Sequence, residues 1–129
     1  MKRIRILVVD DEPAVRHVAS RLLRAAGYVV LTAGGGDEAL RMADRHRGDL
    51  RLLITDISMP GLGGVALAER MVRMEPSLKV LYASGYPAGT RSGPDPIGPG
   101  VDFIAKPFTA ADLVRKVREV LTRSGHPGR

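Results

Sequence analysis

Short apolar runs alternate with helix-like patterns along most of the chain. The apolar runs are rich in aliphatic and β-branched residues and are bounded by turn-forming residues, which is typical of strands. Most of them are continuous instead of alternating, as expected for a parallel sheet that helices cover on both faces. Strands are predicted at residues 4–9, 28–32, 52–55, 80–83 and 103–105.

Apolar residues at helical spacing fill the segments between these runs. Stripes within residues 15–26, 67–74 and 113–121 predict amphipathic helices, and a weaker pattern spans 37–47. Gly27 follows the first helix as a C-cap glycine would, and Pro76 closes the third helix. Thr109 is a suitable N-cap for the last helix, with Asp112 in the position of a capping-box acid.

One segment departs from the alternation. Residues 86–100 are crowded with glycine and proline, which lowers helix propensity and removes amide donors. We therefore expect a fourth helix that is short or irregular in this segment. The domain is predicted to span residues 1–123, and residues 124–129 to form a flexible C-terminal tail.

The predicted order of elements indicates an open α/β sheet with right-handed crossovers. Ligands of such sheets bind at the carboxyl ends of the strands, where the strand order reverses. Five polar residues lie at those ends: Asp10, Asp11, Asp56, Ser84 and Lys106. Three neighbouring carboxylates repel one another unless a cation neutralises them, and Mg²⁺ suits hard oxygen ligands. With Lys106 and Ser84 near oxygens of a phosphoryl group on Asp56, the pattern indicates a phosphoryl-transfer site.

Composition limits the alternatives. The chain has 129 residues, enough for one domain, and no cysteine, which excludes disulfides and thiolate sites. It contains no apolar run long enough for a membrane span and no pattern of a secretory signal at its start, so we expect a cytoplasmic location. The net charge of +6 comes from basic residues spread over several predicted helices. This spread favours solvated helix faces over a nucleic-acid interface.

Four short motifs, each at the end of its own predicted strand, resemble the landmarks of response-regulator receiver domains of two-component systems. They are VVDDEP (8–13), TDISMPG (55–61), ASG (83–85) and AKPF (105–108), in the order of that family. The resemblance covers roughly residues 4–122 and is shared with stand-alone chemotaxis-type receivers and with receivers of hybrid sensor histidine kinases. It implies a flavodoxin-like, doubly wound five-stranded parallel sheet in the order 2-1-3-4-5.

The resemblance also implies roles for single residues. Asp56 would accept a phosphoryl group from a phosphohistidine, and Lys106 would pair with the acyl phosphate. Asp11 and Asp56 would bind Mg²⁺ directly and Asp10 largely through water. The ligand set would be completed by the backbone carbonyl of Ser58. Two switch residues are implied as well: Ser84, which would bond a phosphate oxygen, and Phe103, whose ring would report that movement.

These roles imply a signalling switch that assists its own phosphorylation and dephosphorylation and is not otherwise an enzyme. Its expected partners are a histidine kinase or histidine phosphotransfer protein and a downstream protein, without direct DNA or membrane binding. Three alternatives remain open: a receiver module of a hybrid histidine kinase, a phosphorylation-independent binding module, and a Mg²⁺-dependent flavodoxin-like hydrolase.

Blander interpretations exist for several residues. Ser84 could be only a strand-end cap, and Phe103 could be ordinary core. The triplet at 34–36 lacks the context of a phosphate-binding loop and is interpreted as a flexible connection. The chain's three histidines lie in separate elements without metal-ligand spacing and are interpreted as surface or packing residues: His17, His46 and His126.

Overall fold

The computed structural model describes residues 3–85 and 101–123, in which strands and helices alternate as predicted. The strands are β1 (Arg5–Val9), β2 (Val29–Ala33), β3 (Leu50–Asp56), β4 (Lys79–Ser84) and β5 (Asp102–Ala105). The helices are α1 (Pro13–Ala25), α2 (Gly36–Arg45), α3 (Gly64–Met74) and α4 (Ala110–Thr122). The predictions of an irregular helix at 86–100 and of a tail at 124–129 fall outside the described residues.

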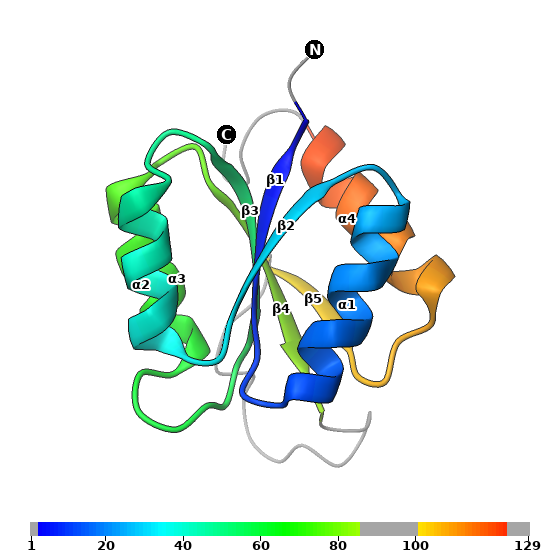
Figure 1. Ribbon diagram of the computed structural model, residues 1–129, viewed down its shortest axis with the longest axis horizontal. Helices are drawn as coiled ribbons and strands as arrows, with labels where there is room; N and C mark the ends of the chain where they lie inside the picture. The colour runs from blue at the N-terminus through cyan, green and yellow to red at the C-terminus, as the bar shows by residue number, and fades with distance from the viewer. Residues whose placement is uncertain (1–2, 86–100, 124–129) are drawn as a thin grey trace.

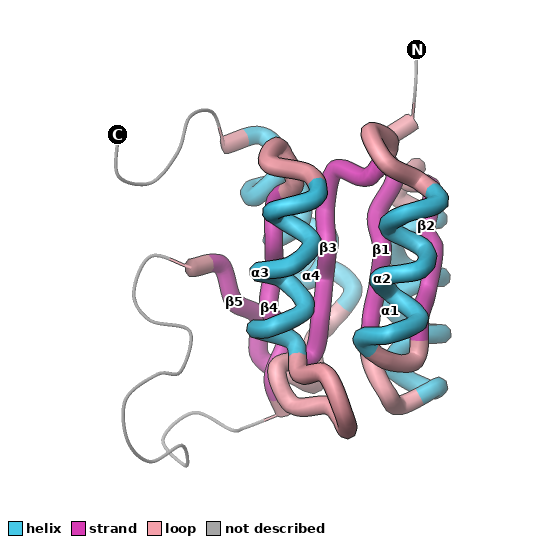
Figure 2. Tube along the Cα trace, turned by 90° about the vertical axis from the view of Figure 1, so that its left-hand side faces the viewer, coloured by secondary structure: helices cyan, strands magenta, loops and turns pink. Residues whose placement is uncertain are grey.

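The strands form one parallel sheet in the order β2-β1-β3-β4-β5, which confirms the expected fold class. Figure 2 shows the strands side by side in this order. From β1 the chain proceeds to β2 on one side of the sheet and later to β3 on the other. The strand order therefore reverses between β1 and β3, and a crevice is expected at the carboxyl ends of these two strands.

Helices cover both faces of the sheet. Figure 1 shows α2 and α3 on one face and α1 and α4 on the other. Alternate residues of β1 serve the two cores, because Ile6 and Val8 face the α1 and α4 side while Leu7 and Val9 face the α2 and α3 side. All four side chains are buried, which explains why this strand appears in the sequence as a continuous apolar run.

Two predicted helix caps agree with the structure. Gly27 has φ 101° just after α1, and the Thr109 hydroxyl accepts a hydrogen bond from the Asp112 amide at the start of α4. The interpretation of residues 34–36 as a flexible connection was wrong for Gly36, whereas Gly34 and Gly35 lie between β2 and α2. Gly36 is the first residue of α2 and is buried. Leu62 packs so closely against it that a Cβ there would overlap the Leu62 side chain.

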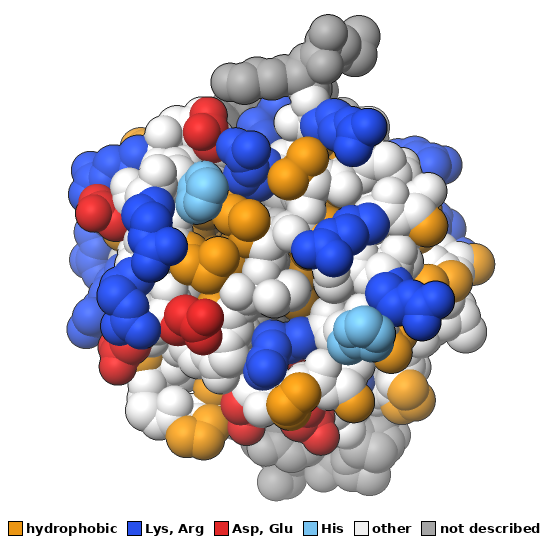
Figure 3. Space-filling model, viewed as in Figure 1, with side chains coloured by type: hydrophobic (Ala, Val, Ile, Leu, Met, Phe, Trp, Pro, Cys, Tyr) orange, Lys and Arg blue, Asp and Glu red, His pale blue; other side chains and the backbone are white. Residues whose placement is uncertain are grey.

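Charge is dispersed over the face of the molecule seen in Figure 3. On the face shown in Figure 3, lysine and arginine side chains lie over both helical layers, with acidic side chains between them, and form no single patch. This supports the interpretation of the net charge of +6 as solvated helix faces. No helix within 3–85 or 101–123 has both the length and the apolar character needed to cross a bilayer.

Candidate functional site

The carboxyl ends of β1 and β3 bring three aspartates together. Asp56 is the last residue of β3, and Asp10 and Asp11 directly follow the last residue of β1. One carboxylate oxygen from each of the three lies within 4.8 Å of the others. Asp10 and Asp56 are buried, whereas Asp11 is exposed, so the cluster opens to solvent on the Asp11 side.

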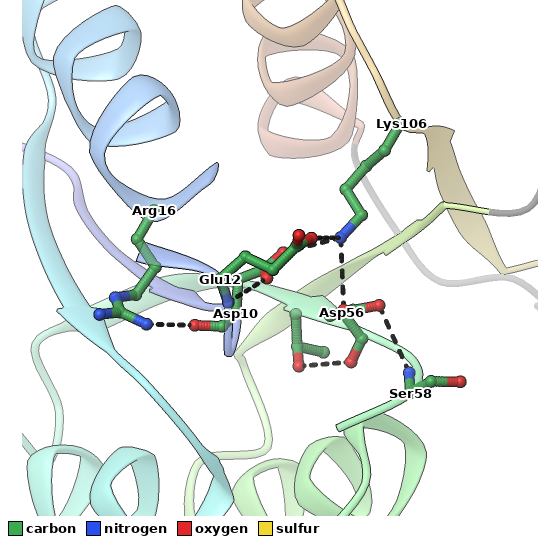
Figure 4. A network of polar contacts seen from close by, with 7 residues as sticks. Asp10, Glu12, Arg16, Asp56, Ser58 and Lys106 are labelled. Atoms are coloured by element: carbon green, nitrogen blue, oxygen red, sulfur yellow. Dashed lines mark hydrogen bonds and ion pairs between the residues drawn. The ribbon is translucent and has the colours of Figure 1, made fainter. Parts of the chain in front are cut away.

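A single lysine ammonium lies between the two buried carboxylates. Lys106 follows β5, and its Nζ lies 2.9 Å from Asp10 Oδ2 and 3.3 Å from Asp56 Oδ2. Figure 4 shows its side chain reaching from the end of β5 to both carboxylates. Its backbone amide donates a 2.7 Å hydrogen bond to the carbonyl of Ser84, which fixes the chain as it leaves the sheet. The structure therefore confirms that these strand ends converge.

Burial shapes the electrostatics of the cluster. The pKa of Asp56 is raised, first because burial disfavours the charged carboxylate and further because Asp10 is negative, while Lys106 opposes the rise. Burial alone would lower the pKa of Lys106, but its hydrogen bonds and charge interactions with Asp10 and Asp56 outweigh this and raise it. The lysine is therefore held protonated, yet it does not fully compensate the buried carboxylates.

Asp10 is held by contacts on all sides. Its amide donates to the carbonyl of Ala33 at 3.2 Å, and its Oδ1 accepts from the amide of Glu12 at 2.9 Å. Its own carbonyl accepts a 2.6 Å hydrogen bond from Nη1 of Arg16. The Glu12 carboxylate lies 3.8 Å from Nζ of Lys106. Sequence reasoning missed the Glu12 amide and the Arg16 guanidinium, because hydrogen bonds from or to main-chain atoms leave no residue-type signal.

The main chain around Asp56 is crowded by the start of α3. The amide of Gly64 donates to the carbonyl of Ile57 at 2.9 Å, and a Cβ at Gly64 would overlap the main-chain oxygen of Asp56. Only glycine permits this close approach. The Asp56 side chain is held less tightly, since Oδ1 accepts from the Ser58 amide at 3.4 Å. The other carboxylate oxygen of Asp56, Oδ2, contacts Nζ of Lys106.

The two predicted switch residues lie on the strands beyond β3. Ser84 is buried at the end of β4, one residue past Ala83, which is the register partner of Asp56. Phe103 lies in β5 opposite Tyr82, is half-buried, and packs against the core on the α2 and α3 side. These positions suit the predicted roles, which stay predictions.

The donor set is suited to a hard divalent cation. Three carboxylates with oxygens within 4.8 Å of one another, one of them facing solvent, could hold a metal ion that keeps part of its water shell. A bound cation would also relieve the repulsion between Asp56 and Asp10, which adds to the effect of burial in raising the pKa of Asp56.

A model of the response regulator receiver domain matches residues 6–118. This chain belongs to that family. It is 31% identical over 118 residues to the sensor kinase CckA of Brucella abortus (strain 2308), covering 92% of this chain and 12% of the kinase. It is 32% identical over 118 residues to the response regulator receiver protein CpdR of the same organism, covering 91% and 96% of the two chains.

A solved structure supports the same assignment. The receiver domain of the hybrid histidine kinase CckA is 40% identical, with a TM-score of 0.77 and coverage of 92% of this chain and 99% of that one. The present receiver domain spans about half the length of several other relatives, which are transcriptional regulatory proteins. Receiver domains are phosphorylation-dependent switches of two-component signalling, and the predicted family and fold are thereby confirmed.

Proposed function

We propose that Asp56 is the phosphoryl acceptor of this receiver domain and that Mg²⁺, held by Asp10, Asp11 and Asp56, assists the transfer. The convergence of three carboxylates at the ends of β1 and β3 with the Lys106 ammonium, which follows β5, is the observation that carries the proposal. The backbone carbonyl of Ser58 is proposed as a further ligand. When bound, Mg²⁺ would neutralise charge on the carboxylates and on the phosphoryl oxygens.

Asp56 is a better nucleophile than Asp10 for a geometric reason. Both carboxylate oxygens of Asp10 are engaged at 2.9 Å, one by the Glu12 amide and one by Lys106. The contacts to Asp56 are longer, at 3.3 and 3.4 Å, so an oxygen can be released at a smaller cost. Its raised pKa also makes that oxygen more basic and hence more nucleophilic.

The proposed step is transfer from a phosphohistidine of a histidine kinase or phosphotransfer protein. An Asp56 oxygen attacks the phosphorus, the phosphorus–nitrogen bond breaks, and the imidazole leaves with the electron pair and takes a proton. Lys106 moves from the carboxylates to the acyl phosphate, where its charge pairs with the new oxygens. Ser84 then bonds a phosphate oxygen and Phe103 follows, which would change the surface offered to a downstream protein.

Phosphorylation by a small donor tests the assignment directly. The protein is incubated with acetyl phosphate and Mg²⁺, and intact mass is compared for wild type, Asp56→Asn and Asp44→Asn, an exposed aspartate of α2. Modification that requires Mg²⁺, persists in Asp44→Asn and vanishes in Asp56→Asn is expected. Equal modification in Asp56→Asn would contradict the assignment.

The identity of the physiological donor is a second question. Because the solved receiver with 40% identity comes from a hybrid histidine kinase, such kinases and their phosphotransfer proteins are the first donors to test. Transfer is followed by the loss of label from the phosphohistidine and its gain on this chain. Amide shifts at Ser84 and Phe103 on adding beryllofluoride would support the proposed switch, and shifts confined to the aspartates would count against it.

A further inference from the structure

Arg16 lies beside the aspartate cluster and contacts the main chain of Asp10. It belongs to the first turns of α1, and its Nη1 donates a 2.6 Å hydrogen bond to the main-chain oxygen of Asp10. Figure 4 shows the guanidinium on the opposite side of Asp10 from Lys106. The helix that follows β1 thus reaches back and binds the loop from which it starts.

The guanidinium occupies a restricted space between two loops. A Cβ added at Gly34, in the loop after β2, would lie 3.2 Å from Arg16 Nη1. The amide of Gly34 is itself held by Oε1 of Glu38 at 2.8 Å, and the Asp10 amide is bonded to the carbonyl of Ala33. The absence of a side chain at Gly34 therefore leaves room for the guanidinium beside the carbonyl of Asp10.

These contacts fix the main chain of Asp10 on both sides. We propose that Arg16 is a positioning residue for the Mg²⁺ site, holding the peptide between Asp10 and Asp11 so that the Asp11 carboxylate faces the other two. This inference rests on the proposed function, since it assumes that the cluster binds Mg²⁺. Groups beyond the direct ligands commonly govern metal affinity by orienting those ligands.

The sign of the effect separates positioning from simple charge. A guanidinium near a cation site repels the cation, so an effect of charge alone would make Mg²⁺ bind more tightly when Arg16 is neutralised. Positioning has the opposite consequence. Loss of the hydrogen bond lets the peptide between Asp10 and Asp11 move, and Mg²⁺ then binds more weakly.

The chain offers a matched control on the same helix. Arg24 also donates from its guanidinium to a main-chain oxygen, that of Val30, at 3.1 Å. Arg16→Met and Arg24→Met each remove one arginine-to-carbonyl hydrogen bond and one charge from α1. Only the first is expected to change the Mg²⁺ site.

Calorimetric titration with MgCl₂ and amide spectra of Asp11 measure the effect without requiring phosphorylation. We expect the Mg²⁺ dissociation constant to rise about three- to tenfold in Arg16→Met and to stay within about twofold of wild type in Arg24→Met. Unchanged or tighter Mg²⁺ binding in Arg16→Met would overturn the positioning role of Arg16 but would leave the proposed function of the domain intact. No Mg²⁺ binding by the wild type would overturn the proposed function as well.

A second variant keeps the test decisive if Arg16→Met does not fold. Gly34→Val leaves Arg16 in the chain but fills the space beside Nη1, and Gly35→Val is its control because a Cβ at Gly35 meets nothing within 4 Å. Weaker Mg²⁺ binding in Gly34→Val than in Gly35→Val supports the inference. Equal binding in the two overturns it.

Discussion

Lys106 shows how one residue can connect distant parts of the chain. Its side chain is 11% exposed, and its ammonium contacts carboxylates at the carboxyl ends of two different strands, one of them 96 residues away in the sequence. Removing a lysine from such a site leaves two buried carboxylates without their cation, and an uncompensated buried charge is more costly than a lost surface ion pair. The same ammonium would be needed later at the phosphoryl group.

Lys106→Met is therefore expected to destabilise the fold by about 2–3 kcal/mol at neutral pH. Lys116 offers the comparison, because it also contacts two acids, Asp102 at 4.0 Å and Glu119 at 3.0 Å, but in a more exposed position. Lys116→Met should cost less than about 1 kcal/mol. Urea denaturation in the absence of metal measures the free energy of unfolding of both variants. Equal losses of stability would show that burial of the carboxylates contributes little to the cost of removing Lys106.

At the scale of elements, the start of α3 packs directly against the end of β3. Gly64→Ala should destabilise the fold by at least about 2 kcal/mol, because its Cβ would overlap the main chain at Asp56 and force the helix or the loop to shift. Gly63→Ala is the matched control, since its Cβ would lie 3.5 Å from the nearest oxygen, that of Ile57. Thermal unfolding should rank the two variants in this order; a smaller loss in Gly64→Ala would refute the packing argument.

The start of α4 depends on the charge of Asp112. Hydrogen bonding from Thr109 is the main cause that lowers the pKa of Asp112, with Arg115 contributing further. A lowered pKa in the fold means that the carboxylate stabilises the fold above its ordinary value of 3.8, and that this contribution disappears as the pH falls through the lowered value.

Asp112→Asn should therefore lower the melting temperature at pH 7 and at pH 5 by similar amounts, with the difference shrinking below pH 4. Circular dichroism melts of the two proteins across this range test the expectation. In a Thr109→Ala background, where the capping partner is lost, the substitution should have a smaller effect at pH 7. A difference that persists undiminished at low pH would mean that the charge is not responsible.

At the scale of the whole molecule, the sheet could be predicted because burial on both faces leaves a direct record in the sequence. The strand ends were less predictable. The strand predicted at 52–55 is longer in the structure, where β3 spans Leu50–Asp56. The prediction stopped short because Arg51, which is exposed, interrupts the apolar run at the point where the pairing of β3 with β1 shifts register. A bulge of this kind turns one side chain outward while the strand continues.

Some residues of the site could likewise be predicted from the sequence, and others could not. Asp10, Asp56 and Lys106 could be predicted to meet because each lies at the carboxyl end of a parallel strand, where topology alone brings them together. Arg16 could not be predicted, because it acts on a main-chain oxygen and looks like any other basic residue of an amphipathic helix. A role that depends on the chemistry of the side chain can be predicted from the sequence, whereas a hydrogen bond to a main-chain oxygen can be recognised only in the folded structure.

The energetics of the site and of the whole fold are linked through Asp56. Because its pKa is raised in the fold, its ionisation disfavours folding at pH values above its unfolded-state pKa. Without metal at pH 7, Asp56→Asn should therefore be more stable than wild type. The advantage should vanish below about pH 4, where the carboxylate is protonated in both states.

Mg²⁺ should reverse this order. A ligand that binds only the folded state stabilises it by mass action, by about 2.7 kcal/mol at one hundred times the dissociation constant. Wild type should gain this stability as MgCl₂ is added, whereas Asp56→Asn, which lacks one proposed ligand, should gain much less. Melting curves at increasing MgCl₂ would then cross. If the two proteins instead gain equally, Asp56 is not a ligand, and the stabilising ion binds elsewhere on the domain.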